Sequence, residues 1–312
     1  MSVRIMHPTH VVAGIDFELG WENVLAHAAN HAAMHNAALH LVHALQPTHW
    51  LLRQVLDGDA FTAHERDLRE LAHKRLAEAA ATVTSVPTSF EVRVGKPSQE
   101  ILASGAELKA GLVVCGVGSP KAVTTLVRGG TADRLLRLSP VPLLVVGPEA
   151  PRPIVRIVSP TALGPGGTCA ITNAHHLVAA RHGEVDALYT VSLPSLLRSY
   201  SGDVVALSKR IEEEARMMFA KHLEAIELPA GANTTVPVFH AVDESTPIDE
   251  IILNEARSRN ADMIVCALGG RRFASAVIGK ITDKLIRALP CSLLGLPDTW
   301  VTGGRAATPA AD

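Results

Sequence analysis

The sequence has few aromatic residues and almost no net charge, and both shortages exclude classes of partner. Phenylalanine, tryptophan and tyrosine make up 4% of the 312 residues, and the formal net charge is −2 at pH 7. Proteins that bind nucleic acid present basic surfaces and aromatic rings on which bases stack. We therefore expect no nucleic-acid partner.

Long apolar runs are also missing. No run approaches the roughly 20 residues that a membrane-spanning helix needs, and the start from Met1 to Pro8 is not that of a signal peptide. The composition, 47% hydrophobic and 19% charged, is ordinary for a soluble α/β protein. We expect a cytoplasmic protein that does not associate with membranes.

Residues that bind metals are present without the spacing of a metal site. The four cysteines include no C-x-x-C pair, which favours small buried hydrophobic residues over a redox or metal role. His27, His31 and His35 recur along one expected helix, a spacing that could hold Zn²⁺. No cysteine or carboxylate completes that set, so we expect a solvated helix face and no metal.

The strongest pattern in the sequence is an internal repeat. A buried strand, a glycine-rich loop, a helix start and a second buried strand follow one another between Leu112 and Val146, and the same order returns about 150 residues later. Such self-similarity indicates two copies of one domain. Residues that match at an offset of 150 are Pro97 and Pro247, Gly129 and Gly279, Asp133 and Asp283, Arg137 and Arg287, and Pro140 and Pro290.

Each copy alternates apolar strand segments with helical segments. In the first copy we expect strands at 10–15, 39–45, 90–94, 112–115 and 141–146, with helices at 18–36, 50–82, 99–109 and 132–138. In the second we expect strands at 154–158, 186–191, 235–242, 262–267 and 293–296, with helices at 168–181, 204–226 and 282–287. This alternation predicts an α/β fold of two five-stranded parallel sheets, with helices on both faces and right-handed crossovers.

Prolines mark the boundary between the copies. The segment 148–153 contains three prolines and reads as a short, stiff linker. We therefore expect one domain at 1–147 and a second at 154–298. The tail at 299–312 is small and polar, and we expect it to be disordered. Ser98 is the expected N-cap of the helix at 99–109.

Polar and glycine residues gather where two strands of the first copy end. Asp16 follows the first strand, and Gly116 begins the glycine-rich loop after the fourth strand. Ligands of such sheets bind beyond the carboxyl ends of the strands, and bare backbone N–H groups at a helix start suit phosphate. The alternatives are a tight connection without a ligand for the loop, and a simple helix cap for Asp16.

These residues resemble the universal stress protein family. In that family the first strand ends in an aspartate that contacts the nucleoside, a role that falls to Asp16 here. Strand four then runs into G-x-x-G and, nine residues later, a G-(S/T) pair that opens a helix. The resemblance implies a Rossmann-like domain with strand order 3-2-1-4-5 and a site for ATP or AMP, with or without Mg²⁺. Its matching residues in the first copy are Gly116, Gly118, Ser119, Gly129, Gly130 and Thr131, with Gly118 one position early and Gly129 or Gly130 as the helix-opening glycine.

The second copy departs further from the family pattern. After its first strand come Ser159, Pro160, Thr161 and Ala162, with no aspartate. Ala267 replaces the first glycine. The residues left for a weaker second site are Gly269, Gly270, Gly279 and Lys280, and Lys280 could meet a phosphate as a point charge.

The sequence favours binding over catalysis. It contains no G-x-S-x-G elbow, no G-x-x-x-x-G-K-(S/T) loop and no H-E-x-x-H pair, so at most it is a slow ATPase. Our hypothesis is a stress-response module that binds adenine nucleotide, mainly in the first copy. The alternative is a nucleotide-independent scaffold or regulatory protein with decayed sites, acting through protein partners.

The fifth strand of each copy predicts how the halves pair. In the order 3-2-1-4-5 this apolar strand lies at an open sheet edge, which invites aggregation unless it is covered. We expect Leu143–Val146 and its repeat at 293–296 to cover each other across a pseudo-two-fold axis. If they do not, a second chain in a homodimer would cover them. Val145→Lys should then separate or destabilise the halves and expose apolar surface to a hydrophobic dye, whereas a structure with these strands on opposite sides would refute the pairing.

Overall fold

The computed structural model describes residues 3–46, 58–117, 130–193, 203–243, 245–268 and 285–301. The chain divides into two compact units. We call His7–Val146 the first domain, and Gly147–Asp312 together with Met1–Met6 the second domain. Each is described by itself.

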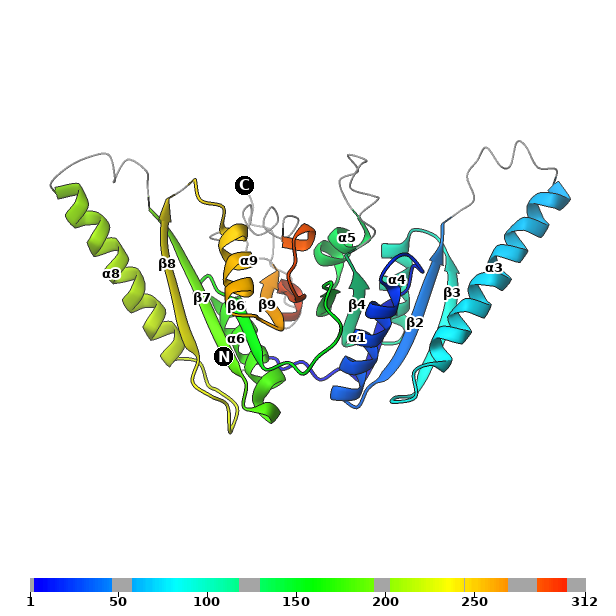
Figure 1. The fold of residues 1–312 in the computed structure, drawn as a ribbon, viewed down its shortest axis with the longest axis horizontal. Coiled ribbons are helices and arrows are strands. Elements are labelled where there is room, and N and C mark those ends of the chain that lie inside the picture. The colour runs from blue at the N-terminus through cyan, green and yellow to red at the C-terminus, as the bar shows by residue number, and fades with distance from the viewer. Residues whose placement is uncertain are drawn as a thin grey trace, which may run out of the picture. The chain divides into compact units, whose positions relative to one another are not determined.

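The first domain is a parallel sheet with helical crossovers (Figure 1). Its strands pair in the order β3-β2-β1-β4-β5, all parallel. Its elements are β1 (His10–Gly14), α1 (Trp21–Met34), β2 (Ala38–Leu45), α3 (Gly58–Ala81), β3 (Thr88–Val94), α4 (Pro97–Glu107), β4 (Leu112–Gly116), α5 (Thr131–Leu138) and β5 (Leu143–Val146).

The second domain repeats this plan. Its strands pair in the order β8-β7-β6-β9-β10, again all parallel. The predicted α/β class and the order 3-2-1-4-5 are therefore confirmed in both halves. Its elements are β6 (Arg156–Pro160), α6 (Pro165–Val178), η2 (Ala179–Arg181), β7 (Glu184–Leu193), α8 (Asp203–Glu224), β8 (Val236–Asp243), α9 (Ile248–Ser258), β9 (Met263–Leu268), β10 (Ser292–Pro297) and α11 (Asp298–Val301).

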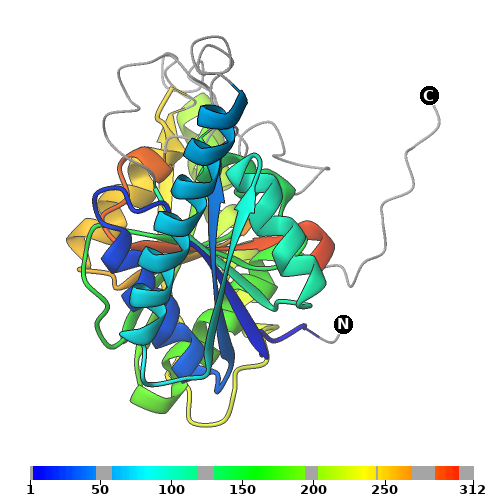
Figure 2. The same ribbon diagram turned by 90° about the vertical axis from the view of Figure 1, so that its right-hand side faces the viewer.

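Helices cover both faces of each sheet. In the first domain α1 packs on β1 and β4, α3 packs on β2 and β3, and α4 packs on β1 and β2 and against α5. Figure 2 views this domain with α3 and α4 on opposite sides of the strands. In the second domain α6 packs on β6 and β9, and α8 packs on β7 and β8. Among the described residues, no helix has the length and apolar character to cross a bilayer.

The central strands supply the core. Val11, Val12 and Ala13 of β1 are fully buried, as are Ile157 and Val158 of β6. A side chain buried on either face of a doubly covered sheet leaves no polar position, so these strands are continuous apolar runs. Each such residue stabilises the fold by about 1.5–3 kcal/mol relative to an exposed position.

The cysteines belong to this core. All four are buried and free. Burial raises the pKa of Cys115, Cys266 and Cys291 to about 12 and that of Cys169 to about 11. The thiols therefore stay protonated near neutral pH, and the prediction of small hydrophobic residues is confirmed.

The predicted cap of α4 is wrong by two residues. Lys96 is the N-cap, Pro97 occupies the first helical turn, and Ser98 lies inside the helix with 3% of its surface exposed. Proline suits this place because its fixed φ is helical and its missing N–H would have no partner there. The proline therefore sets the helix start.

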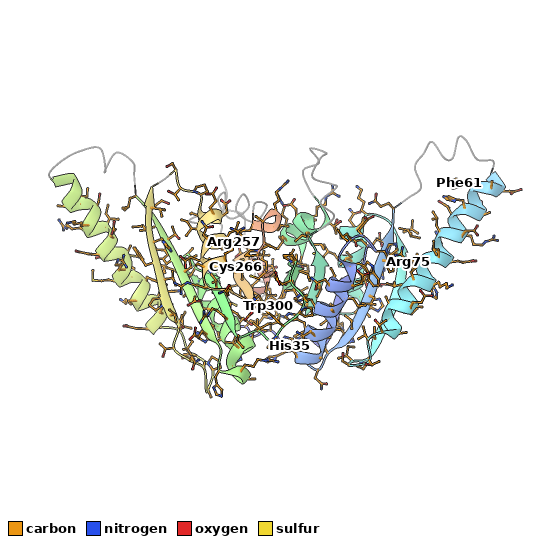
Figure 3. All side chains as sticks on the ribbon, in the orientation of Figure 1. His35, Phe61, Arg75, Arg257, Cys266 and Trp300 are labelled. Atoms are coloured by element: carbon orange, nitrogen blue, oxygen red, sulfur yellow. The ribbon has the colours of Figure 1, made fainter. Side chains whose placement is uncertain are left out.

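The helix α11 corrects the expectation of a disordered tail from residue 299. Asp298–Val301 form a short helix, and Trp300 is 4% exposed. The Arg4 guanidinium lies 5.1 Å from the centre of the Trp300 ring, a cation–π contact (Trp300 is labelled in Figure 3). A large ring that buries its area anchors the chain here. Residues 302–312 lie outside the described part of the chain.

The N-terminal segment is held on the second domain by one buried asparagine. Met6 N donates to Asn173 Oδ1 at 2.8 Å, and Asn173 Nδ2 donates to the Arg4 carbonyl at 2.9 Å. The same Nδ2 donates to the Cys169 carbonyl at 2.9 Å. The amide of Asn173 therefore pairs with Arg4 and Met6 as a neighbouring strand would.

The row of histidines on α1 is buried, so the expected solvated face is wrong. His27 and His31 are 9% and 1% exposed, because the row lies on the helix face that packs on the sheet. No group of three His, Cys, Asp or Glu in the described ranges could hold a metal ion. Burial, followed by the charges of His35 and His27, lowers the pKa of His31 to about 3.

The N-terminal segment should contribute measurably to the stability of the second domain. Asn173→Ala leaves two buried backbone groups unpaired, so we expect the free energy of unfolding to fall by about 2 kcal/mol in a urea titration. Asn254→Ala, at an exposed position on α9, is the matched control and should change it by less than about 0.5 kcal/mol. In a chain that lacks residues 2–6, Asn173→Ala should cost less. An equal cost would show that the segment is not held this way.

His31 should make the first domain sensitive to acid. Its pKa is about 6.5 in the unfolded chain and about 3 in the fold, so below pH 6.5 the unfolded state binds the extra proton. The free energy of unfolding should therefore fall as the pH drops, by about 2 kcal/mol from His31 between pH 7 and pH 5. Urea titrations at both values measure this difference. His31→Gln should reduce it by that amount, and an unchanged difference would contradict the assignment.

Candidate functional site

The carboxyl ends of β1 and β4 meet where the strand order of the first domain reverses. Val11, Val12 and Ala13 pair in parallel with Leu112, Val113 and Val114. Asp16 follows β1 and Gly116 ends β4, so both leave the sheet at the same edge. An open α/β sheet forms its ligand crevice at this reversal, between neighbouring strands whose crossovers run on opposite faces.

Asp16 does not cap α1. The N-cap of that helix is Gly20, which makes no side-chain cap bond. The Asp16 side chain is exposed, and its Oδ1 accepts a hydrogen bond from Glu18 N at 3.0 Å. The intervening residue Phe17 has a positive φ of 58°, which turns the chain away before the helix starts. The cap alternative is therefore wrong, and the carboxylate keeps an oxygen that accepts no hydrogen bond within the described residues.

The charge of Asp16 reaches the end of β4. Burial, and after it the Asp16 carboxylate, raise the pKa of the Cys115 thiol to about 12. Cys115 directly precedes Gly116. The carboxylate thus acts electrostatically on the strand from which the glycine loop departs, as two parts of one site should.

Gly130 and Thr131 open the helix α5. Gly130 is its exposed N-cap, and its carbonyl accepts the first helical bond from Arg134 N at 3.1 Å. A Cβ placed on Gly130 would have nothing within 4 Å, so the helix start is open to a ligand or to a larger side chain. Three other predicted site residues, Gly118, Ser119 and Gly129, lie outside the described residues.

A cluster of rings beside Asp16 was not foreseen from the sequence. The centroid of the Phe17 ring lies 5.2 Å from that of Trp21 and 5.0 Å from that of His43. The Arg75 guanidinium, which extends from α3 toward the sheet in Figure 3, lies 4.1 Å from the Phe17 centroid. His43 Nδ1 donates to the Ile15 carbonyl at 2.6 Å. These contacts fix the backbone that carries Asp16. Rare aromatic residues next to Asp16 were a usable signal, whereas Arg75 has none.

The second domain has no carboxylate at the position of Asp16. Ile15 N donates to Val42 O, and Thr161 N donates to Leu188 O, both at 2.9 Å, so Thr161 takes the place of Ile15. The next residue is Ala162. The positive φ of Phe17, 58°, recurs at Leu163, 55°. The two turns are therefore equivalent, and only the first presents an acidic side chain.

The helix α6 crowds the corresponding crevice of the second domain. A Cβ placed on Gly166, in its first turn, would lie 2.9 Å from the Cβ of Ala267 near the end of β9. Only glycine permits so close an approach. Four predicted residues of the weaker site lie outside the described residues, namely Gly269, Gly270, Gly279 and Lys280.

Comparison with known proteins agrees with this architecture. The sequence matches the model of the universal stress protein family over residues 8–147 and again over 154–297. A universal stress protein from Archaeoglobus fulgidus DSM 4304 superposes with a TM-score of 0.61 at 16% identity, covering 92% of this chain and 96% of its own. A functionally unknown protein from Pseudomonas aeruginosa PAO1 gives a TM-score of 0.62 at 16% identity, covering 96% of each chain. No protein with a curated description matches significantly.

The structural likeness, at this low identity, concerns the fold. The two family matches are independent of it and together span most of the sequence. Their limits fall on either side of the proline-rich segment 148–153 that separates the repeats. The chain therefore belongs to the universal stress protein family and carries two of its domains in tandem.

Proposed function

We propose that the first domain binds an adenine nucleotide, ATP or AMP, and that the protein acts through this site as a cytoplasmic module of a stress response. The observation that carries the proposal is the placement of Asp16 and Gly116 at one edge of the sheet, at the reversal of strand order. A carboxylate and a glycine loop are two chemically different anchors. They suit a ligand with a hydroxyl-bearing sugar at one end and phosphate at the other.

Each described residue has a chemical role in this proposal. Asp16 accepts hydrogen bonds from the nucleoside through the carboxylate oxygen that the turn to Glu18 leaves available. The backbone N–H groups at Gly130 and Thr131 meet phosphate oxygens, because the first N–H groups of a helix lack intrahelical partners and carry positive partial charge. Gly116, Gly118, Ser119 and Gly129 complete the loop between them. Mg²⁺ would accompany a triphosphate by neutralising phosphate charge.

The difference between the domains supports a single main site. The second domain has Ala162 where the first has Asp16, and α6 approaches β9 closely through Gly166. Without a carboxylate the nucleoside loses its polar anchor. Gly269, Gly270, Gly279 and Lys280 are left as a weaker phosphate site in this proposal.

The chemistry of the crevice favours binding over catalysis. The thiol nearest to Asp16 belongs to Cys115, whose pKa of about 12 keeps it protonated and unreactive near neutral pH. Hydrolysis of a bound triphosphate would need a positioned water, and none of the described residues near Asp16 is arranged as its base. Slow ATP hydrolysis is the most that this arrangement supports.

Gly130→Asp separates ligand binding from folding. The new carboxylate would stand where phosphate oxygens approach, so calorimetric titration of the full-length protein with ATP or AMP should show affinity in the wild type and none in the variant. The thermal melt should not fall, because the site is open and aspartate is a favoured N-cap.

Gly279→Asp, at the matching position of the repeat, is the control. It should leave most of the affinity in place. Loss of binding in the control alone would move the site to the second domain. No affinity in the wild type up to millimolar nucleotide, together with no nucleotide released from purified protein on heating, would favour the alternative of a scaffold that acts through protein partners.

A further inference from the structure

An arginine-rich pocket lies at the other end of the second sheet, where β6 and β7 begin. It has a volume of about 550 Å³, within the range of small-molecule sites. Four arginines from four different segments line it, together with two carboxylates. These residues are Arg152, Arg156, Arg181, Arg259, Glu184 and Asp262.

The fold does not require this charge, because the first domain makes the same turns without it. Asp262 N donates to Arg156 O at 2.8 Å, and at the equivalent place Gly111 N donates to His10 O at 3.0 Å. His10 thus replaces an arginine, and Gly111 replaces an acid. The same main-chain bond therefore forms with and without the charged side chains.

The two remaining arginines have equally uncharged counterparts at helix ends. Arg259 N donates to the carbonyl four residues before it and precedes Asn260, whose φ is 51°; Leu108 does the same and precedes Lys109, whose φ is also 51°. By the same criteria Arg181 lies where the first domain has His35. The pocket's charge is thus a property of the second domain alone.

Three of the arginines are already paired with acids. Arg152 Nε lies 2.6 Å from Asp262 Oδ1, and Arg259 Nε lies 2.7 Å from Glu255 Oε2. Arg156 is hydrogen bonded to Glu184. These ion pairs hold the guanidinium groups in fixed orientations and leave several of their N–H donors for other acceptors.

Arg181 is the exception. Its side chain is exposed, lines the pocket, and makes no ion pair with any described residue. A planar guanidinium with free donors, beside three others held in place, suits a tetrahedral anion whose oxygens can bridge several arginines. The excess of four guanidinium groups over two carboxylates in the lining favours an anionic ligand.

We propose that this pocket binds a small molecule through a phosphate group, with Arg181 as its principal contact. The site lies at the amino ends of the strands and in the second domain, so it is distinct from the nucleotide crevice and does not rest on nucleotide binding there. A universal stress protein with this pocket would respond to a second, phosphorylated ligand.

Calorimetric titration of the full-length protein with sodium pyrophosphate at low ionic strength tests the proposal. The protein should carry Gly130→Asp, so that phosphate contacts in the first domain do not contribute. Arg181→Gln in this background should weaken pyrophosphate binding about tenfold, since one charge-assisted contact is lost. Its thermal melt should be unchanged because Arg181 is exposed and unpaired among the described residues.

Arg210→Gln is the matched control, an exposed arginine of α8 that does not line the pocket. It should leave pyrophosphate affinity unchanged, and rising salt should weaken binding in the control but little in Arg181→Gln. No pyrophosphate binding, equal binding with and without Arg181, or equal losses in both variants would overturn the proposal. Binding of citrate in place of pyrophosphate would overturn its assignment to phosphate.

Discussion

The parallel pairing of β1 with β4 is the constraint on which the candidate site depends. Parallel strands end at one edge, so a polar residue after β1 and a glycine at the end of β4 must emerge together whatever the loops do. The crossovers on either side of this pair run on opposite faces, which opens the sheet edge to a ligand. The buried apolar runs that make these strands central therefore also place Asp16 beside Gly116.

The tandem domains show how one fold carries different chemistry. Equivalent turns follow β1 and β6, with the same hydrogen bonds and the same positive φ, yet one presents Asp16 and the other Ala162. At the opposite edge the difference is reversed, because the second domain has arginines where the first has His10 and His35. Function in this chain is thus decided by side chains at the strand ends, while the core is shared.

The sequence predicted what depends on local pattern. Alternating apolar strands and helices gave the fold class, and the repeat gave two domains and their strand order. Features that depend on distant contacts escaped it. The histidines of α1 read as polar and solvated, but the helix turns them toward the sheet. Trp300 looked like part of a loose tail, because its contact with Arg4 joins opposite ends of the chain. Similarly, nothing in the sequence of α3 links Arg75 to Phe17.

The account's central claim is that a nucleotide occupies the crevice between Asp16 and Gly116. A crystal structure of the full-length protein grown with ATP and Mg²⁺ tests it most directly, because it reports the occupancy of each domain separately. The account predicts electron density for a nucleotide in the first domain, with the nucleoside on Asp16 and phosphate at the start of α5. Density at the second domain beside Ala162, with an empty first crevice, would contradict it.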